Sequence, residues 1–148
     1  MSQFTLADTI DFPDIYRIKK GLIGSAAIHS KNDIYRAIRS KRIYILKNAL
    51  ELAGYIWIEP NPHQHTCYIE AIGVSTSHLH KDREFELLKN AIVWVIQNTY
   101  REALIHIDIK NKHFIELLKD IEFHKIDIDN DFYGEDKHAY LMRKTFHI

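Results

Sequence analysis

The stretch GVSTSHLHKDREFELLKN, residues 73–90, raises the first chemical question about this chain. A predicted strand ends at Val74, and a predicted helix begins near Asp82 after a short link. Strand–loop–helix units often hold a phosphate, because backbone N–H groups at the helix start point at the anion and glycines let it approach. Here no glycine follows Gly73, and Asp82 and Glu84 stand at the helix start. The stretch is therefore either a modified phosphate site or a helix start whose carboxylates stabilise the helix dipole.

Two carboxylates on neighbouring β-rich segments have the chemistry of a general base. Glu59 ends one segment, and Glu70 lies within the next, residues 66–74. Side chains alternate between the faces of a strand, so Tyr68, Glu70 and Ile72 are expected on one face. A general base must lie within hydrogen-bond reach of the proton that it removes. Carboxylates on these strands can face a reaction centre at the sheet, so Glu70 and Glu59 are predicted as catalytic residues. The alternative for each is a surface carboxylate or a structural ion pair.

The ten histidines do not form a recognisable metal motif. His63 and His65, like His78 and His80, have a spacing that can place two rings on one side of an extended chain. No cysteine pair and no HExxH motif accompanies them, although zinc sites usually have such a pattern. We therefore predict solvated loop histidines and no metal. His106 alternates with isoleucines, so a structural role on the other sheet face is expected.

Length and composition limit the class of protein. A chain of 148 residues is expected to form one domain, residues 1–148. Twenty basic and twenty acidic residues balance, which argues against nucleic acid or an anionic membrane as the main partner. The single cysteine, Cys67, cannot form an internal disulfide, and no apolar run approaches the roughly 20 residues of a membrane span. Without a secretory leader at the N-terminus, a cytoplasmic protein is expected.

Hydrophobic periodicity predicts one mixed α/β sheet with helices on both faces. The order is β-α-α-β-β-β-α-β-α-β-β, with three consecutive antiparallel strands in the middle and a closing hairpin. The predicted elements are a strand at 4–6, helices at 11–22 and 30–41, strands at 42–46, 50–59 and 66–74, a helix at 82–98, a strand at 103–109, a helix at 111–120, and strands at 123–128 and 138–146.

This order and three C-terminal segments resemble the GNAT superfamily of acyl-CoA N-acyltransferases. YIEAIGVS, residues 68–75, is similar to the fourth strand of the family. NKHFIELLKDIEFHK, residues 111–125, is similar to its Asn-initiated helix, which ends in a Leu-Gly-Phe-like tripeptide. HAYLMRK, residues 138–144, is similar to its closing strand. The resemblance covers nearly the whole chain and implies a single-domain GNAT-like fold, with a mostly antiparallel sheet flanked by helices.

The resemblance also implies a cofactor, acetyl-CoA. In such proteins the fourth and fifth strands separate, and the pantetheine arm pairs with backbone groups of the fourth strand. Those groups correspond to Ile72 and Val74, and the Val74 N–H is the implied oxyanion donor. Asn111 matches the family's Asn near the pantetheine or pyrophosphate. The implied cofactor-binding residues are Ile72, Val74, Lys81, Asp82, Arg83, Glu84 and Asn111.

The chain departs from the family at two places. The phosphate loop R/Q-x-x-G-x-G/A falls on Leu79, Asp82 and Glu84, where side chains crowd the anion and carboxylates repel it. Lys81 and Arg83 can offset part of this repulsion.

The second departure lies in the Asn-initiated helix. Leu118 stands where many relatives carry a tyrosine general acid, and Glu122 replaces a glycine. Tyr140 is a candidate replacement for the acid, against the alternative of an ordinary strand tyrosine.

Two functions follow from the resemblance and its departures. The first is transfer of an acyl group, most simply acetyl, from acyl-CoA to an unidentified amine on a small molecule or a protein. The second is a fold relative that has lost acyl-CoA binding and serves as a binding or regulatory module. Homodimerisation through sheet edges or the C-terminal hairpin is compatible with either.

Overall fold

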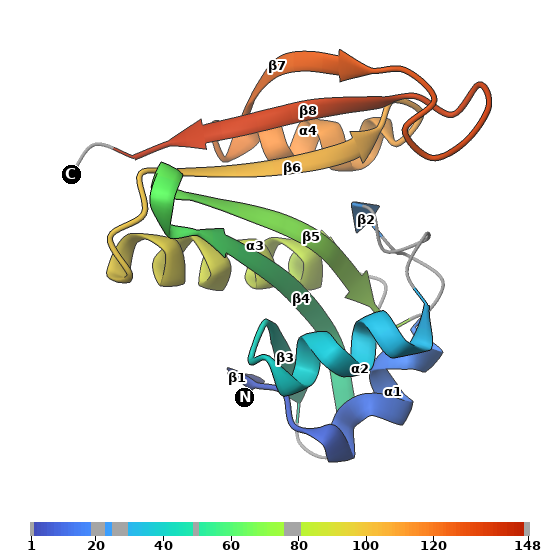
Figure 1. The fold of residues 1–148 in the computed structure, drawn as a ribbon, viewed down its shortest axis with the longest axis vertical. Helices are drawn as coiled ribbons and strands as arrows, with labels where there is room; N and C mark the ends of the chain where they lie inside the picture. Colours follow the sequence, from blue (N-terminus) through green and yellow to red (C-terminus); the bar gives the residue numbers. More distant parts are fainter. Residues whose placement is uncertain (1, 19–22, 25–29, 49–50, 76–80, 147–148) are drawn as a thin grey trace.

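The computed structural model describes residues 2–18, 23–24, 30–48, 51–75 and 81–146. Figure 1 shows one curved sheet with helices packed against it. The strands are β1 (Ser2–Leu6), β2 (Ile23–Gly24), β3 (Ile43–Asn48), β4 (Glu51–Asn61), β5 (Thr66–Val74), β6 (Glu102–Asp108), β7 (His124–Asp129) and β8 (Ala139–Thr145). The helices are α1 (Phe12–Arg17), α2 (Lys31–Arg39), α3 (Lys81–Gln97) and α4 (Lys112–Asp120), with short 3-10 turns at Thr9–Asp11 and Pro62–Gln64.

The sheet has the order β1-β3-β4-β5-β6-β8-β7, and β2 pairs with β5 beside this path. Every strand pair in the described chain is antiparallel except β5–β6, which is parallel. A parallel pair needs a crossover connection, which α3 supplies on one face of the sheet. The predicted mixed, mostly antiparallel sheet is confirmed, and β2 is an addition to it.

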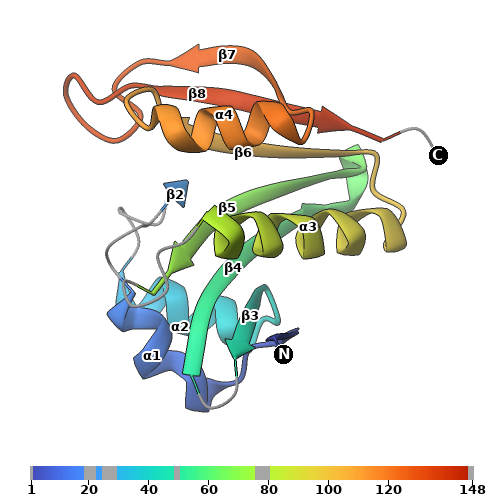
Figure 2. The same ribbon diagram turned by 180° about the vertical axis from the view of Figure 1, so that it is seen from behind.

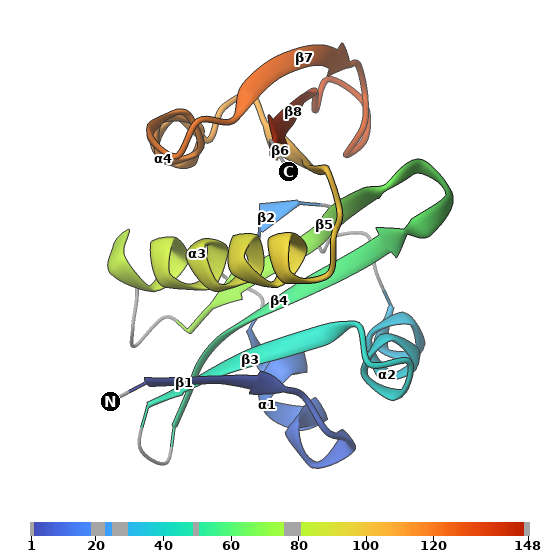
Figure 3. The same cartoon turned by 90° about the vertical axis from the view of Figure 1, so that its left-hand side faces the viewer.

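Two hydrophobic cores lie on opposite faces of the sheet. The larger core packs α3 and α4 against the sheet, through residues such as Leu88 and Phe114. The smaller core packs α1 and α2 against the other face, around Tyr55 and Trp57. Figures 2 and 3 show this division of the helices. Helices on both faces were predicted, and the structure confirms them.

Local capping explains where two of these helices begin. The Ser30 hydroxyl accepts from the Asp33 N–H and the Asp33 carboxylate accepts from the Ser30 N–H, which forms a capping box at the start of α2. Asn111 caps α4, because its Oδ1 accepts from the Phe114 N–H at 3.2 Å. Both N-termini are therefore set by a polar side chain that accepts from the N–H three residues further along.

A β-bulge changes the face assignment on β5. Trp57 pairs with Ala71 and Ile58 pairs with Ile69, so Glu70 is an extra residue in β5. The strict alternation predicted for Tyr68, Glu70 and Ile72 is therefore wrong. Ile72 joins Ile69 in the larger core, whereas Ala71 belongs to the smaller one.

Gly73 is required by the packing between β4 and β5. It lies opposite Tyr55, and a Cβ at this position would lie 2.4 Å from Tyr55 Cε1 and 3.0 Å from Ile18 Cγ2. Tyr55 is 2% exposed, so its ring has little room to move. The glycine thus admits an aromatic ring against the strand that carries the candidate site.

Replacing Gly73 with alanine is expected to destabilise the protein. Overpacking of this kind costs about 1–3 kcal/mol, which urea unfolding will measure as a lower free energy of unfolding. In a Tyr55→Leu background the same Gly73→Ala change should cost less, because the clashing ring is gone. An equal loss in both backgrounds would contradict the packing explanation.

Candidate active site

The candidate site lies where β5 and β6 separate. Their parallel pairing runs from Thr66–Glu102 to Ile69–Ile105 and then ends. Beyond this point, the Ser75 N–H donates to the Ala53 carbonyl of β4 at 2.9 Å. Successive N–H groups of a strand point to opposite sides, so the Val74 N–H and the backbone groups of Ile72 point toward β6. The edge predicted for pantetheine therefore faces the gap.

Strand β2 lies in this gap. Ile23 stands opposite Ile72 and Gly24 opposite Ala71 in an antiparallel pair, and β2 also contacts β6. Figure 1 shows β2 between β5 and β6 on the side where these strands diverge. A pantetheine arm that pairs with Ile72 needs the same backbone groups. Binding of such an arm therefore requires β2 to leave this position.

The start of α3 matches the prediction from the sequence. The helix begins at Lys81, which puts Asp82 and Glu84 in its first turn. The structure does not describe residues 76–80, which include His78, Leu79 and His80. It also leaves out the side chains of Lys81, Asp82 and Glu84.

Arg83, in the first turn of α3, has a described side chain that lies along the helix. Its guanidinium pairs with Glu86 at 3.7 Å, and the arginine side chain is 21% exposed. The ion pair holds this cation near the first turn of α3.

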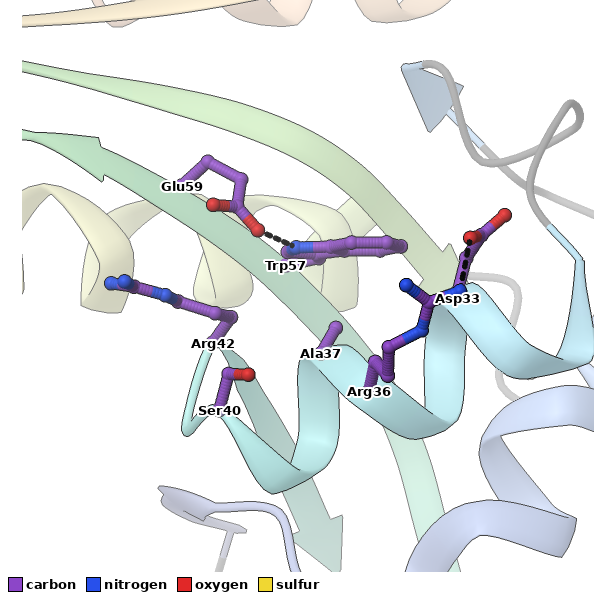
Figure 4. Close-up of a pocket in the computed structure, with 7 residues that line it drawn as sticks. All are labelled: Asp33, Arg36, Ala37, Ser40, Arg42, Trp57 and Glu59. Carbon is purple, nitrogen blue, oxygen red and sulfur yellow. Dashed lines mark hydrogen bonds and ion pairs between the residues drawn. The ribbon is translucent and has the colours of Figure 1, made fainter.

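Of the two predicted bases, Glu59 lies in a pocket between α2 and β4. The pocket has a volume of about 370 Å³ and is lined by Asp33, Arg36, Ala37, Ser40, Arg42, Trp57 and Glu59. The Glu59 carboxylate accepts a hydrogen bond of 2.7 Å from Trp57 Nε1 (Figure 4). Glu70 is half-buried at the β5 bulge, next to the end of the β5–β6 pairing. The two carboxylates thus occupy different places on the sheet.

A hydrogen-bonded network that the sequence did not predict joins three strands. The Tyr68 hydroxyl on β5 contacts His106 Nδ1 on β6, and His106 Nε2 contacts the Asp129 carboxylate on β7. Phe132 stacks on the imidazole with ring centroids 4.0 Å apart. His106 is indeed on the opposite face from Ile105 and Ile107, as expected. Alternation alone could identify that face, but the partners depend on strand order.

The residues of the second departure from the family pattern, in and after α4, have packing and backbone roles. Leu118 is fully buried in the larger core, so this position carries only packing. Tyr140 packs on the same core, and Lys125 Nζ lies 4.6 Å from the centre of its ring. Glu122 has a left-handed backbone with φ of 70°, a conformation in which glycine is unstrained.

Other reactive side chains have structural explanations. Burial raises the pKa of the Cys67 thiol to about 12, which keeps it protonated and unsuited to nucleophilic attack. Asp131, Asp136 and His138 gather closely enough to hold a metal ion. However, the Asp136 N–H donates to the Asp131 carboxylate, and the Asp131 N–H donates to His138 Nδ1. These bonds shape the exposed turn between β7 and β8.

Comparison with known proteins identifies one family. The model of the acetyltransferase (GNAT) family matches residues 12–123. No curated protein sequence matches the chain. Among the described residues, no helix is both long and apolar enough to span a bilayer.

Several solved structures share the whole fold. A ribosomal-protein-S18-alanine N-acetyltransferase from Escherichia coli has a TM-score of 0.86 and 16% identity, covering 100% of this chain and 96% of that chain. Ard1 from Thermoplasma volcanium has a TM-score of 0.85 and 13% identity, with 99% of each chain covered. The yncA protein from Salmonella typhimurium, solved with its cofactor acetyl-CoA, has a TM-score of 0.82 and 13% identity, covering 100% and 95%. At these identities the similarity establishes the fold alone.

Weakening the β2–β5 pairing should strengthen acetyl-CoA binding. Ile23→Pro removes a backbone N–H from β2, and proline disfavours pairing within a sheet. Loss of one hydrogen bond of about 1 kcal/mol corresponds to an affinity about fivefold higher, measured by calorimetric titration. Ile23→Val keeps the N–H and serves as the matched control. Equal affinities for the proline and valine variants would show that β2 does not compete with the cofactor.

Proposed function

Since the chain belongs to the acetyltransferase (GNAT) family, we propose that it transfers an acyl group, most simply acetyl, from acyl-CoA to a primary amine. The observation that carries this proposal is the separation of β5 from β6 beyond Ile69 and Ile105. It leaves the edge of β5 at Ile72 and Val74 directed into the gap. A thioester lying there would have a backbone donor beside its carbonyl.

The chemistry of the transfer fits this edge. Attack of the amine on the thioester carbon produces a tetrahedral intermediate with a negative oxygen. The Val74 N–H is the proposed donor to that oxygen, and one such donor is typically worth 10²- to 10³-fold in kcat. Because the main chain makes this contact, it does not depend on the side chains that differ from the family pattern. Glu70, at the bulge beside the gap, lies closer to this edge than Glu59, which lines the pocket between α2 and β4, and is the better placed base of the two.

The acidic start of α3 is the main obstacle to this function. A carboxylate about 4 Å from a phosphate at an effective dielectric of about 20 costs about 4 kcal/mol before screening. Micromolar binding amounts to only about 8 kcal/mol. The proposed cofactor site therefore depends on Lys81 and Arg83 to offset Asp82 and Glu84.

A second candidate function is a binding or regulatory module without acyl-CoA binding. Two observations favour it: β2 pairs with Ile72 at the cofactor edge, and Leu118 is buried where relatives carry an acid. Titration of the purified protein with acetyl-CoA separates the two functions. Micromolar binding supports the acyltransferase, whereas no binding at millimolar acetyl-CoA would reject it in favour of the module.

Neutralising the acidic pair should tighten acetyl-CoA binding. The double variant Asp82→Asn, Glu84→Gln removes two charges while keeping side-chain size, so at least tenfold higher affinity is expected from the repulsion above. Asp82→Gly, Glu84→Gly additionally removes the side chains, and any further gain measures crowding. Asp14→Asn, which removes an exposed α1 carboxylate paired with Arg17, is the charge-matched control. Unchanged affinity in both double variants would contradict an electrostatic obstacle at α3.

A further inference from the structure

The network of Tyr68, His106 and Asp129 lies at the mouth of the gap. Ile69 and Ile105 form the last β5–β6 pair, so His106 is the first residue of β6 beyond the pairing. Side chains of His106 and Asp108 alternate with buried Ile105 and Ile107 and therefore project on the α1–α2 face. On β5 the last paired residue, Ile69, lies three positions before Ile72 and five before Val74, about 10 Å and about 17 Å along a strand. A network that serves a reaction at Val74 therefore has to reach it through the acceptor amine and a chain of waters.

The network has a defined direction of proton donation. The ionised Asp129 carboxylate can only accept, so His106 Nε2, which contacts it, carries a proton. In the neutral imidazole Nδ1 is then an acceptor, and the Tyr68 hydroxyl donates to it. The imidazole is 12% exposed and the Asp129 side chain 41%. With Phe132 stacked on the ring, the histidine is shielded while the carboxylate keeps contact with solvent.

A second hydroxyl reaches the same place. Tyr133 Oη is buried and has no hydrogen-bond partner among the described residues. Burial raises the pKa of Tyr133, and the neighbouring Tyr68 and Asp108 raise it further. A buried hydroxyl without a partner is costly, and an incoming polar group would relieve that cost. The Tyr133 hydroxyl thus adds a second polar group beside the Tyr68–His106 contact.

We propose that Tyr68, His106 and Asp129 form a proton relay for the acceptor amine, with Tyr68 as the catalytic residue and the other two as positioning residues. The inference rests on the proposed acyl transfer and assigns the base to Tyr68 in preference to Glu70. It gives the site an acid–base group although the family position, Leu118, is buried. The acceptor is a primary amine that approaches from the α1–α2 face.

The relay takes one proton from the amine and delivers it to the departing thiolate. The neutral amine attacks the thioester carbon and forms the C–N bond. A proton passes from nitrogen to the Tyr68 oxygen while the Tyr68 proton moves to His106 Nδ1, and Asp129 stabilises the imidazolium. When the C–S bond breaks, the proton returns through Tyr68 to the thiolate sulfur. The products are an amide and free CoA thiol, and the relay regains its starting state.

Nitrogen NMR of labelled histidines tests the relay directly. Ten histidines are present, and His106→Asn identifies the His106 signals by their loss. At neutral pH the relay requires one tautomer, with the proton on Nε2. Tyr68→Phe should move the nitrogen signal of His106 Nδ1 toward that of an acceptor without a hydrogen bond. Asp129→Asn should shift the His106 proton to Nδ1 or give a mixture of the two imidazole tautomers. A proton on Nδ1 in the unmodified protein would overturn the relay, because Tyr68 could not then pass its proton to the ring.

Turnover completes the test. Release of CoA thiol from acetyl-CoA is measured with an alanine-terminated peptide and spermidine as amine probes. Tyr68→Phe should lower the amine-dependent rate by about 10²- to 10⁴-fold and leave acetyl-CoA affinity unchanged. Tyr100→Phe, a half-buried tyrosine stacked on Trp94, is the matched control. A larger loss for Glu70→Gln than for Tyr68→Phe would return the base to Glu70.

Failure of the relay and failure of the acyl transfer are distinguishable. Absence of acetyl-CoA binding would reject the acyl transfer itself. Normal acetyl-CoA binding with the reversed His106 tautomer would reject only the relay.

Discussion

The end of the β5–β6 pairing after Ile69 and Ile105 is the constraint on which the rest of the site depends. It leaves main-chain groups of Ile72 and Val74 without β6 as a neighbour, although both residues lie deep in the protein. Buried backbone groups need partners, and in this structure β2 supplies one at Ile72. A pantetheine arm is a second possible partner for the same edge, so the gap has two competing occupants. The proposed cofactor edge is therefore one that the chain itself can fill.

The bulge at Glu70 connects this edge with the opposite face of the sheet. It turns Ile72 toward the larger core, whereas Tyr68 stays with His106 on the α1–α2 face. Tyr68 of the proposed relay and Ile72 of the proposed cofactor edge thus belong to one strand, although their side chains lie on opposite faces of the sheet. Gly73 keeps the same strand close to Tyr55. Small irregularities in β5 thus determine what the site can do.

Local patterns predicted most of the fold, and tertiary pairing determined the rest. Residues 66–74 form a strand with the predicted bounds, and Ser30 and Asn111 cap helices through bonds to residues three positions away. The bulge at Glu70 was not predictable, because it is defined by the partners of β5 in β4 rather than by the sequence of β5. Strand β2 comprises only two residues, too few for a periodic pattern. The Tyr68–His106–Asp129 contacts join strands that strand order alone brings together.

Backbone amide NMR during an acetyl-CoA titration observes the main-chain groups of the β5 edge directly. We expect the amides of Ile72 and Val74 to shift on binding, the Val74 amide to exchange more slowly with solvent, and the β2 amides to lose their pairing with β5. Unchanged Ile72 and Val74 amides at saturating acetyl-CoA would contradict this expectation. Acetyl-CoA would then bind elsewhere, and the gap between β5 and β6 would be a closed part of the fold.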